Sequence, residues 1–437
     1  MDIFRAYDIR GVYKQDLSES VLLDLGKALG TFLGGNKNIA VGYDTRISSK
    51  RLFDSFAKGL TSTGCNVINL GMVPNPMVYF YAWKNKTFGV MITASHNPKE
   101  WNGLKIVRPS GISFINEIKE LKKLYKFKKF MSGSGKVTKD NVVEKYRIYL
   151  KRKIGMVKKK VVVECFGTVG VKALPMLKDI GLDIVSLHDK PDGKFFGFDR
   201  PEPKGKNLNM LKKAVKKNNA DFGFAFDGDA DRAVFVDDKG RELDGSTMSV
   251  VFIRHILKKK RGKIILTYDC ASEIQKIVED LGGRMVWSRV GHGYIERRAI
   301  YERALFAGEQ SSHFYFNEFY PFSDGILSAM YLAKILSESG EKLSKMVDRT
   351  KLRPVEKLYI NVSTDDNKNR IVKALKKKYR NSETMMDGIK IKVGSDEWVI
   401  IRASQTNPEV NLIVEAKTKA RLKELVEKYS KAIRKEI

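Results

Sequence analysis

Three segments of the 437-residue chain share one pattern: an apolar strand-like run, a polar loop, an amphipathic helix, a glycine and a second strand. They open with "NIAVGYDTR", "KKVVVECFGTVG" and "GKIILTYDCA". This is the βαβ pattern, which produces parallel strand pairs joined by right-handed crossovers. The segments start roughly 120 and 100 residues apart, which is too far for a solenoid repeat. The chain therefore predicts three consecutive, related α/β domains.

The C-terminal part follows a different order. "KLYINVST", "GIKIKVG", "EWVIIRAS" and "EVNLIVEA" resemble strands, whereas "NKNRIVKALKKKY" and "KARLKELVEKYSKAIRKEI" are amphipathic helices. That order favours a small α+β domain with an antiparallel sheet. "MSGSGK" and "TKLRP" have the composition of linkers. The predicted domains are residues 1–140, 141–245, 246–352 and 353–437.

The formal net charge of +30 has three possible explanations. One is nucleic-acid binding, but the sequence contains no RNP signature, zinc finger or basic heptad region. A second is a set of solvated helix faces coated with lysine, as "KKLYKFKKF" and "LKKAVKK" suggest. The third is a polyanionic ligand. Nucleic acid is therefore not expected as the main partner.

The hydrophobic content of 43% is that of a globular protein. No run of 18 apolar residues is present, and the N-terminus lacks the basic segment and apolar core of a signal peptide. Three widely spaced cysteines read as buried, reduced thiols. The sequence predicts a cytoplasmic protein without a membrane partner, either a monomer or a homodimer.

The stretch "FGFAFDGDADRAVFVDDKG" places Asp227, Asp229 and Asp231 within five residues, between two strand-like runs. Carboxylates packed this closely repel one another unless a cation or a proton is bound. Oxygen-only ligands suit Mg²⁺. Arg232 follows at once and can either grip a phosphate oxygen or pair with the aspartates. A polar hairpin turn is the structural alternative.

Two other families of metal-binding loop share part of this pattern. An EF-hand needs glycine after the third aspartate and glutamate at position twelve, where this chain has Arg232 and Asp238. An aspartate-nucleophile phosphatase also begins with a strand and D-x-D, and remains a weaker alternative.

The stretch "GVMITASHNPKEWNGLKI" sets Ser95 and His96 in a loop after a buried strand. Ser95 is therefore a nucleophile, a phosphate carrier or an ordinary turn serine. A Ser-His acyl-transfer site also needs an orienting acid and an oxyanion hole, and neither is visible nearby.

Several further loops carry polar side chains. In "LFAGEQSSHFYF", Glu309, Ser311 and His313 can hydrogen-bond sugar hydroxyls. In "VIIRASQTNPEVNLIV", an arginine and two hydroxyls can cradle a phosphate. "RVGHGYIERR" and "FRAYDIRGVY" add residues that fit an anionic ligand, as does Arg46 in "VGYDTRISS". Each loop alone is equally compatible with an ordinary polar turn.

Taken in order, "RAYDIRG", "TASHNP", "NGLKI", "DGDADR", "VGHGYI", "GEQSSH" and "RASQTNP" resemble the motifs of the α-D-phosphohexomutase family over nearly the whole chain. The resemblance implies a heart-shaped enzyme of four domains around a central cleft. The first three domains would share one α/β fold with mixed sheets, and the fourth would be α+β.

The resemblance also implies a set of roles. Ser95 would carry a phosphoryl group, exchanged with a hexose monophosphate through a hexose 1,6-bisphosphate that turns around in the cleft. Mg²⁺ would be the cofactor, and the bisphosphate would also act as activator. The implied catalytic residues are Ser95, Lys105, Arg10, His96 and Arg232, with Lys105 as proton partner. The implied metal ligands are Ser95, Asp227, Asp229 and Asp231. The implied substrate-binding residues are Tyr7, Arg289, Gly291, His292, Glu309, Ser311 and His313. The implied phosphate-binding residues are Arg402, Ser404, Gln405 and Thr406.

"GEQSSHFYF" and "RASQTN" are most similar to the phosphomannomutase/phosphoglucomutase branch, with phosphoglucosamine mutase, a Mg²⁺-dependent phosphatase and a sugar-phosphate sensor as alternatives. Members of that branch often carry a lysine in the third βαβ loop, near "YDCASE". This chain has Asp269, Cys270 and Glu273 there. Arg289 is the expected substitute in phosphate binding. Gln405 and Asn407 also differ from the commonest phosphate-loop forms.

Overall fold

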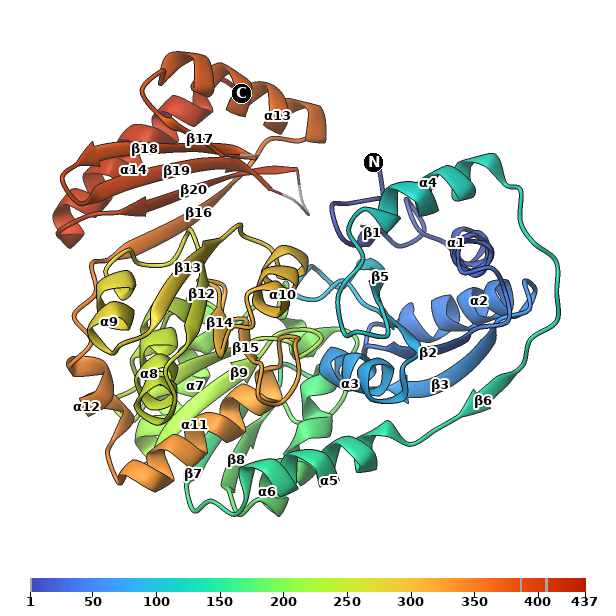
Figure 1. The fold of residues 1–437 in the computed structure, drawn as a ribbon, viewed down its shortest axis with the longest axis horizontal. Helices are drawn as coiled ribbons and strands as arrows, with labels where there is room; N and C mark the ends of the chain where they lie inside the picture. Colours follow the sequence, from blue (N-terminus) through green and yellow to red (C-terminus); the bar gives the residue numbers. More distant parts are fainter. Residues whose placement is uncertain (1, 386, 405–407) are drawn as a thin grey trace.

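The computed structural model describes residues 2–385, 387–404 and 408–437, which form four domains, each built on its own sheet (Figure 1). Domain I is blue to cyan in the figure, domain II green, domain III yellow to orange and domain IV red. Three mixed sheets precede one antiparallel sheet. The predicted fold class is confirmed.

Domain I has a six-stranded sheet in the order β1-β5-β4-β2-β3-β6. Strands β2, β3, β4 and β6 are parallel, whereas β5 is antiparallel to both β4 and β1. The strands are β1 Ile9–Val12, β2 Asn38–Tyr43, β3 Asn66–Met72, β4 Phe88–Ile92, β5 Trp101–Val107 and β6 Val137–Lys139. The helices are α1 Glu19–Phe32, α2 Ser49–Thr61, α3 Asn75–Asn85 and α4 Glu117–Phe127.

Domain II has the strand order β11-β10-β9-β7-β8, in which β9 lies parallel to β7 and antiparallel to β10. The strands are β7 Lys160–Glu164, β8 Asp183–Leu187, β9 Phe222–Phe226, β10 Ala233–Asp237 and β11 Glu242–Leu243. The helices are α5 Val142–Ile154, α6 Leu174–Asp179 and α7 Asn209–Lys217, with short 3₁₀ helices η1 Val169–Ala173, η2 Phe195–Gly197 and η3 Gly205–Leu208.

Domain III has the strand order β13-β12-β14-β15. The strands are β12 Lys263–Thr267, β13 Arg284–Ser288, β14 Phe306–Gly308 and β15 Phe314–Phe316. The helices are α8 Gly245–Lys259, α9 Ile274–Asp280, α10 His292–Tyr301, α11 Gly325–Ser339 and α12 Leu343–Asp348. In domains I to III, the second β-strand of each predicted βαβ segment pairs in parallel with the first, as the pattern requires.

Domain IV has the strand order β16-β20-β19-β18-β17, with every pair antiparallel. The strands are β16 Val355–Asn361, β17 Glu383–Met385, β18 Gly388–Gly394, β19 Glu397–Ala403 and β20 Glu409–Glu415. The helices are α13 Asp365–Lys378 and α14 Lys419–Arg434.

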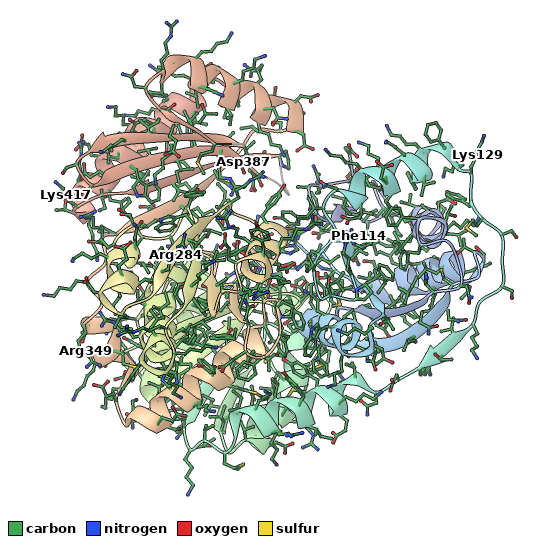
Figure 2. All side chains as sticks on the ribbon, in the orientation of Figure 1. Phe114, Lys129, Arg284, Arg349, Asp387 and Lys417 are labelled. Atoms are coloured by element: carbon green, nitrogen blue, oxygen red, sulfur yellow. The ribbon has the colours of Figure 1, made fainter. Side chains whose placement is uncertain are left out.

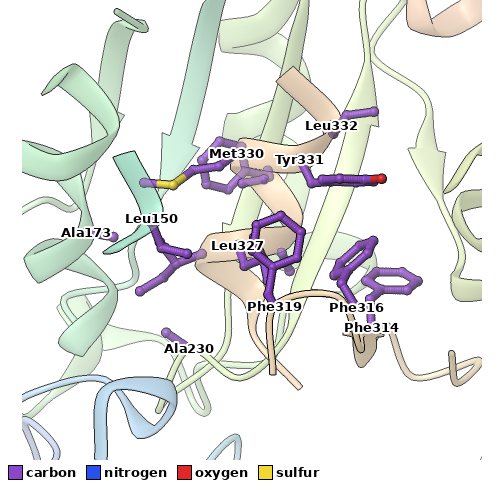
Figure 3. Close-up of a cluster of buried hydrophobic side chains, with 14 of the residues drawn as sticks. Leu150, Ala173, Ala230, Phe314, Phe316, Phe319, Leu327, Met330, Tyr331 and Leu332 are labelled. Carbon is purple, nitrogen blue, oxygen red and sulfur yellow. The ribbon is translucent and has the colours of Figure 1, made fainter. Parts of the chain in front are cut away.

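One hydrophobic core joins domains II and III and includes α3 of domain I, whereas domain IV has a core of its own. Figure 3 shows part of the shared core, where Leu327 and Met330 of α11 lie beside Leu150 of α5, with Phe319 and Phe316 nearby. Apolar burial is the main stabilising contribution of such contacts. Domains II and III therefore form one packed body, against which domain IV rests as a separate unit.

Many basic residues lie on solvent-facing surfaces. In α7, Lys213, Lys216 and Lys217 are exposed, whereas Leu211 and Val215 are buried. Figure 2 likewise places Lys129, Arg349 and Lys417 at the outer edge of the molecule. Among the described residues, no helix is both long and apolar enough to cross a bilayer.

A buried polar cluster fixes the junction of α5 with α11. Asp324 caps α11 by accepting hydrogen bonds from the backbone N–H groups of Ile326 and Leu327, at 2.8 and 2.9 Å. Its other oxygen accepts from the hydroxyls of Tyr146 and Tyr320, at 2.5 and 2.6 Å. Burial raises the pKa of Asp324 to about 6.

Replacing Asp324 by alanine is expected to lower the thermal unfolding midpoint by roughly 4–10 °C, because the helix loses its cap and two buried hydroxyls lose their acceptor. Calorimetry provides the measurement. Asp324→Asn is the matched control, since asparagine keeps a capping oxygen and should lose less. Equal midpoints for Asp324→Ala and the wild type would contradict this account of the junction.

Candidate active site

Ser95 lies in the loop between β4 and β5, at the carboxyl end of a buried parallel strand. Its backbone φ is +52°, in the left-handed region that a serine seldom occupies. The loop supports this conformation: Thr93 Oγ1 accepts a hydrogen bond from the Ser95 N–H at 2.8 Å. The side chain is thereby turned toward domain II.

Arg46 fixes the rest of this loop. Its Nη2 donates to the carbonyls of Ser95 and Asn97, each at 2.7 Å, and its Nη1 donates to the carbonyls of Pro98 and Trp101. Its Nε pairs with Asp44 at 3.0 Å. The sequence suggested an anionic ligand for Arg46, but its buried guanidinium instead holds the serine loop.

The three aspartates occupy the turn between β9 and β10 and face the serine loop. Ser95 Oγ donates to Asp227 Oδ2 at 2.7 Å. Oxygens of Asp227, Asp229 and Asp231 all lie within 4.8 Å of one another, and all three residues are buried. A Cβ at Gly228 would stand 2.0 Å from the Ser95 carbonyl oxygen, so the two loops can approach this closely only with glycine at that position.

This carboxylate cluster fits a hard divalent cation. Its donors are all oxygens, and Asp229 Oδ1 is buried without a hydrogen-bond partner among the described residues. Burial, followed by repulsion from Asp231, raises the pKa of Asp229 to about 7. The Lys105 Nζ lies 2.7 Å from Asp229 and 2.6 Å from Asp231. Burial opposes the charge on Lys105, but Asp229 and Asp231 outweigh it and raise the pKa of Lys105, which is therefore an ammonium.

Three more predicted residues surround Ser95. The Nδ1 of His96 lies 3.2 Å from Ser95 Oγ, and burial and Arg232 lower the pKa of His96, so its ring is neutral. Arg232 Nε donates to Asp227 at 3.1 Å, while its buried Nη2 has no acceptor among the described residues. Arg10 pairs with Asp8 at 2.8 Å. The Arg232 Nη2 is a donor available to an anion beside Ser95.

The predicted sugar loop approaches from domain III, between β14 and β15. Glu309 accepts from the hydroxyl of Tyr315 at 2.8 Å and from the N–H of Gly291 at 3.3 Å. Ser311 Oγ lies 2.9 Å from His313 Nδ1, and His313 Nε2 lies 3.4 Å from Asp231. This loop therefore contacts the aspartate cluster directly.

Tyr7 of domain I and His292 of domain III contact each other where the two domains meet. Their rings pack with centroids 4.4 Å apart, and His292 Nε2 is buried without a partner among the described residues. Arg289 stacks its guanidinium over the Tyr294 ring at 4.2 Å and does not line the cavity described next. The substrate-binding prediction for Arg289 has no support in this geometry.

A cavity of about 110 Å³ is lined by residues of all four domains. Domain IV contributes Arg402, which pairs with Asp387 at 2.6 Å, and Ser404, whose carbonyl accepts from Lys368 at 2.8 Å. The predicted residues that line the cavity are Tyr7, Arg10, Ser95, His96, Lys105, Arg232, Gly291, His292, Glu309, Ser311, His313, Arg402 and Ser404. The predicted phosphate-binding residues Gln405 and Thr406 lie outside the described residues.

Two residues of the site, Asn75 and Lys357, were not predicted from the sequence. Asn75 begins α3 and donates through its N–H to the Asp229 carbonyl at 2.9 Å and through Nδ2 to Asp231 at 3.2 Å. Lys357 on β16 lines the cavity beside Tyr359. The "VPNP" helix start was the one visible signal for Asn75, and the sequence offered none for Lys357.

Comparison with known proteins agrees with this arrangement. Four models of phosphoglucomutase/phosphomannomutase match in order: α/β/α domain I at residues 1–131, α/β/α domain II at 140–240, α/β/α domain III at 244–352 and the C-terminal domain at 360–432. The chain belongs to the phosphoglucomutase/phosphomannomutase family.

Relatives cover the chain almost completely. A phosphomannomutase/phosphoglucomutase of Pseudomonas syringae is 35% identical over 97% of this chain and 93% of its own length. A phosphomannomutase of Methanocaldococcus jannaschii is 33% identical over 99% and 98%. The crystal structure of a phosphoglucomutase/phosphomannomutase family protein from Burkholderia thailandensis matches with a TM-score of 0.85 at 28% identity, covering 100% of this chain and 97% of that one.

Replacing Gly228 by alanine is expected to push the aspartate turn away from the serine loop, because the new Cβ would clash with the Ser95 carbonyl. We expect Mg²⁺ to raise the thermal midpoint of the wild-type protein, and this rise should be lost in Gly228→Ala while the fold persists. Gly34→Ala is the control, since an added Cβ there meets no atom within 4 Å. Its only cost is backbone strain, because Gly34 has a φ of +77°, in the left-handed region. An undiminished Mg²⁺ response in Gly228→Ala would show that the close approach is unnecessary.

Proposed function

We propose that this protein is a phosphohexomutase that moves a phosphoryl group between C1 and C6 of mannose or glucose phosphate through phospho-Ser95. The observation that carries the proposal is the 2.7 Å contact of Ser95 Oγ with Asp227 of the buried aspartate cluster. Ser95 itself lines the cavity to which all four domains contribute. The names of relatives at 31–35% identity supply the substrate class.

In this proposal Asp227, Asp229 and Asp231, with an oxygen on Ser95, hold Mg²⁺. The ion would neutralise charge on the phosphoryl group during transfer, which is what phosphoryl transfer chiefly requires. The available Nη2 of Arg232 would bind a phosphoryl oxygen on the same side. The neutral His96 would help to position that group through its contact with Ser95 Oγ.

Proton transfer is assigned to Lys105. When phospho-Ser95 gives its phosphoryl group to a sugar hydroxyl, the P–O bond to Ser95 breaks and a new P–O bond to the sugar forms. The Ser95 oxygen then needs a proton, and the sugar hydroxyl loses one. Lys105 is an ammonium and can supply the first, after which its neutral amine can accept the second. Arg10 donates a hydrogen bond to Asn97 in the serine loop and adds positive charge near Ser95.

The remaining predicted residues would hold the substrate. Glu309 and Ser311 would accept and donate hydrogen bonds to sugar hydroxyls, with His313, His292, Gly291 and Tyr7 around them. Arg402 and Ser404, with Gln405 and Thr406, would bind the phosphate that is not being transferred. Turning the hexose 1,6-bisphosphate around would then exchange the two phosphates between these sites, so that either end can meet Ser95.

Phosphoglucosamine mutase is the second candidate. The observation in its favour is that a probable phosphoglucosamine mutase of Methanopyrus kandleri is 31% identical over 99% of this chain and 98% of its own length. A coupled mutase assay on mannose 1-phosphate, glucose 1-phosphate and glucosamine 1-phosphate, with Mg²⁺ and a trace of hexose 1,6-bisphosphate, separates the candidates. Turnover of none of them would refute the proposed function.

Replacing Ser95 by alanine is expected to abolish mutase turnover and to remove a mass increment of about 80 Da, the mass of one phosphoryl group. Intact-mass spectrometry after incubation with hexose 1,6-bisphosphate provides the measurement. Ser323→Ala is the control, because Ser323 is also buried near the cluster but donates to the Asp231 carbonyl. A wild-type protein that gains no mass, or a Ser95→Ala variant that still does, would refute the phosphoserine assignment.

Chelation is expected to abolish turnover, and Mg²⁺ to restore it. The Mg²⁺ concentration needed for half of maximal activity should rise as the pH falls from 8 to 6, because Asp229 holds a proton below a pKa of about 7 and the metal must displace it. Titrating activity with Mg²⁺ at each pH tests this. A half-activating concentration that is constant or falls toward pH 6 would contradict it.

A further inference from the structure

The loop after β12 carries Asp269 in the region where members of the branch that this chain resembles often carry a lysine. Asp269 is 1% exposed, and Asp269 Oδ1 accepts a hydrogen bond from Thr267 Oγ1 at 2.6 Å. Its other oxygen, Oδ2, faces domain IV and lies 3.2 Å from the Nζ of Lys357. Domain III therefore holds a buried negative charge against a lysine of the neighbouring domain.

Lys357 extends from β16, the first strand of domain IV, into the same cavity as Ser95 and Arg402. Its side chain is 13% exposed. An ammonium has three donors, and the described residues give this one a single hydrogen-bond acceptor, Asp269 Oδ2. The Tyr359 ring, with its centroid 5.6 Å away, covers another side. Donors of Lys357 therefore remain for a molecule in the cavity.

The charges around Lys357 favour an anion in the cavity. Burial lowers the pKa of Lys357, but Tyr359 and Asp269 outweigh that effect and raise it, so the side chain is charged. Arg402 lies close enough to oppose that charge. Lys357, which is partly buried, and Arg402, which is buried, line the same cavity, and an anion bound between these two cations would relieve their repulsion.

The two competing explanations are weaker. Arg289, the substitute that the sequence suggested, stacks over Tyr294 and does not line the cavity. A purely structural ion pair between domains III and IV would explain the contact of Lys357 with Asp269. It would not explain why the lysine lines the cavity beside Arg402.

We propose that Lys357 binds the phosphate that is not being transferred, together with Arg402, and that Asp269 is the positioning residue that aims the Lys357 ammonium at it. This inference rests on the proposed mutase function. It assigns to domain IV a cationic contact with phosphate, whereas the loop after β12 in domain III presents the carboxylate of Asp269.

Lys357→Met is the central variant, because methionine keeps the length and apolar stem of the side chain and removes its charge. The KM for hexose 1-phosphate should rise roughly tenfold or more, as expected for the loss of a charge-assisted contact with phosphate, with a smaller change in kcat. Lys357→Arg keeps the charge and should recover most of the loss. Lys392→Met is the matched control, an exposed lysine on β18 of the same sheet.

The role of Asp269 is tested by a double-mutant cycle. Asp269→Asn alone should raise the KM for hexose 1-phosphate, because the charged partner that orients the Lys357 ammonium toward the phosphate is lost. In the Lys357→Met background the same change should add nothing to KM, since there is no ammonium left to position. Additive effects of the two changes on KM would refute the positioning role. Equal KM values for Lys357→Met and the wild type would refute the phosphate contact.

Calorimetric titration of hexose 1-phosphate into Ser95→Ala separates this inference from the proposed function, because it measures binding without turnover. If the double variant Ser95→Ala/Lys357→Met binds hexose 1-phosphate more weakly than Ser95→Ala does, and the two proteins have the same thermal midpoint, the phosphate contact is supported. This holds even if the wild type turns over no hexose phosphate. Unchanged affinity refutes it even if the wild type is an active mutase. A Ser95→Ala protein that binds no hexose phosphate at all would refute both.

Discussion

The site depends on the close approach of two loops that are more than a hundred residues apart in the chain. The serine loop of domain I is held by Arg46 and Thr93, and the aspartate turn of domain II is held by Asn75. They can meet because position 228 has no Cβ. Neither loop alone forms a site: the serine needs a cation beside it, and the carboxylates need an occupant that balances their charge.

The same constraint explains the distribution of charge in the cavity. Burying an ion costs several kcal/mol unless a partner compensates it. Each cation around Ser95 has a carboxylate within hydrogen-bonding distance: Arg10 with Asp8, Lys105 with Asp229 and Asp231, Arg232 with Asp227, and Arg402 with Asp387. These pairs hold the cations in place before substrate arrives, which is the condition for effective electrostatic stabilisation. They account for little of the net charge of +30, much of which lies on exposed helix faces such as that of α7.

The sequence predicted most of this arrangement because its signals were local. The βαβ periodicity predicted the three sheets, and short motifs identified Ser95, Asp227 and Glu309 in their loops. The sequence did not predict Lys357 or Asn75, because each contributes through a partner on another domain and stands in no distinctive local pattern. The role of Arg289 stays a prediction: the stacking of its guanidinium over Tyr294 depends on the fold and has no local sequence signal. The cuts at 140, 245 and 352 stay predictions, since cores shared between domains do not mark a boundary at a single residue.

The central claim, that the serine loop and the aspartate turn together form one metal and phosphate site, is tested most directly by anomalous diffraction. Crystals grown with Mn²⁺ in place of Mg²⁺, and with hexose 1,6-bisphosphate, would be measured at the manganese edge. The account predicts one strong peak in contact with Asp227, Asp229, Asp231 and an oxygen on Ser95. A peak elsewhere in the cavity, or a cluster that stays free of metal with Lys105 still paired to Asp229 and Asp231, would contradict it.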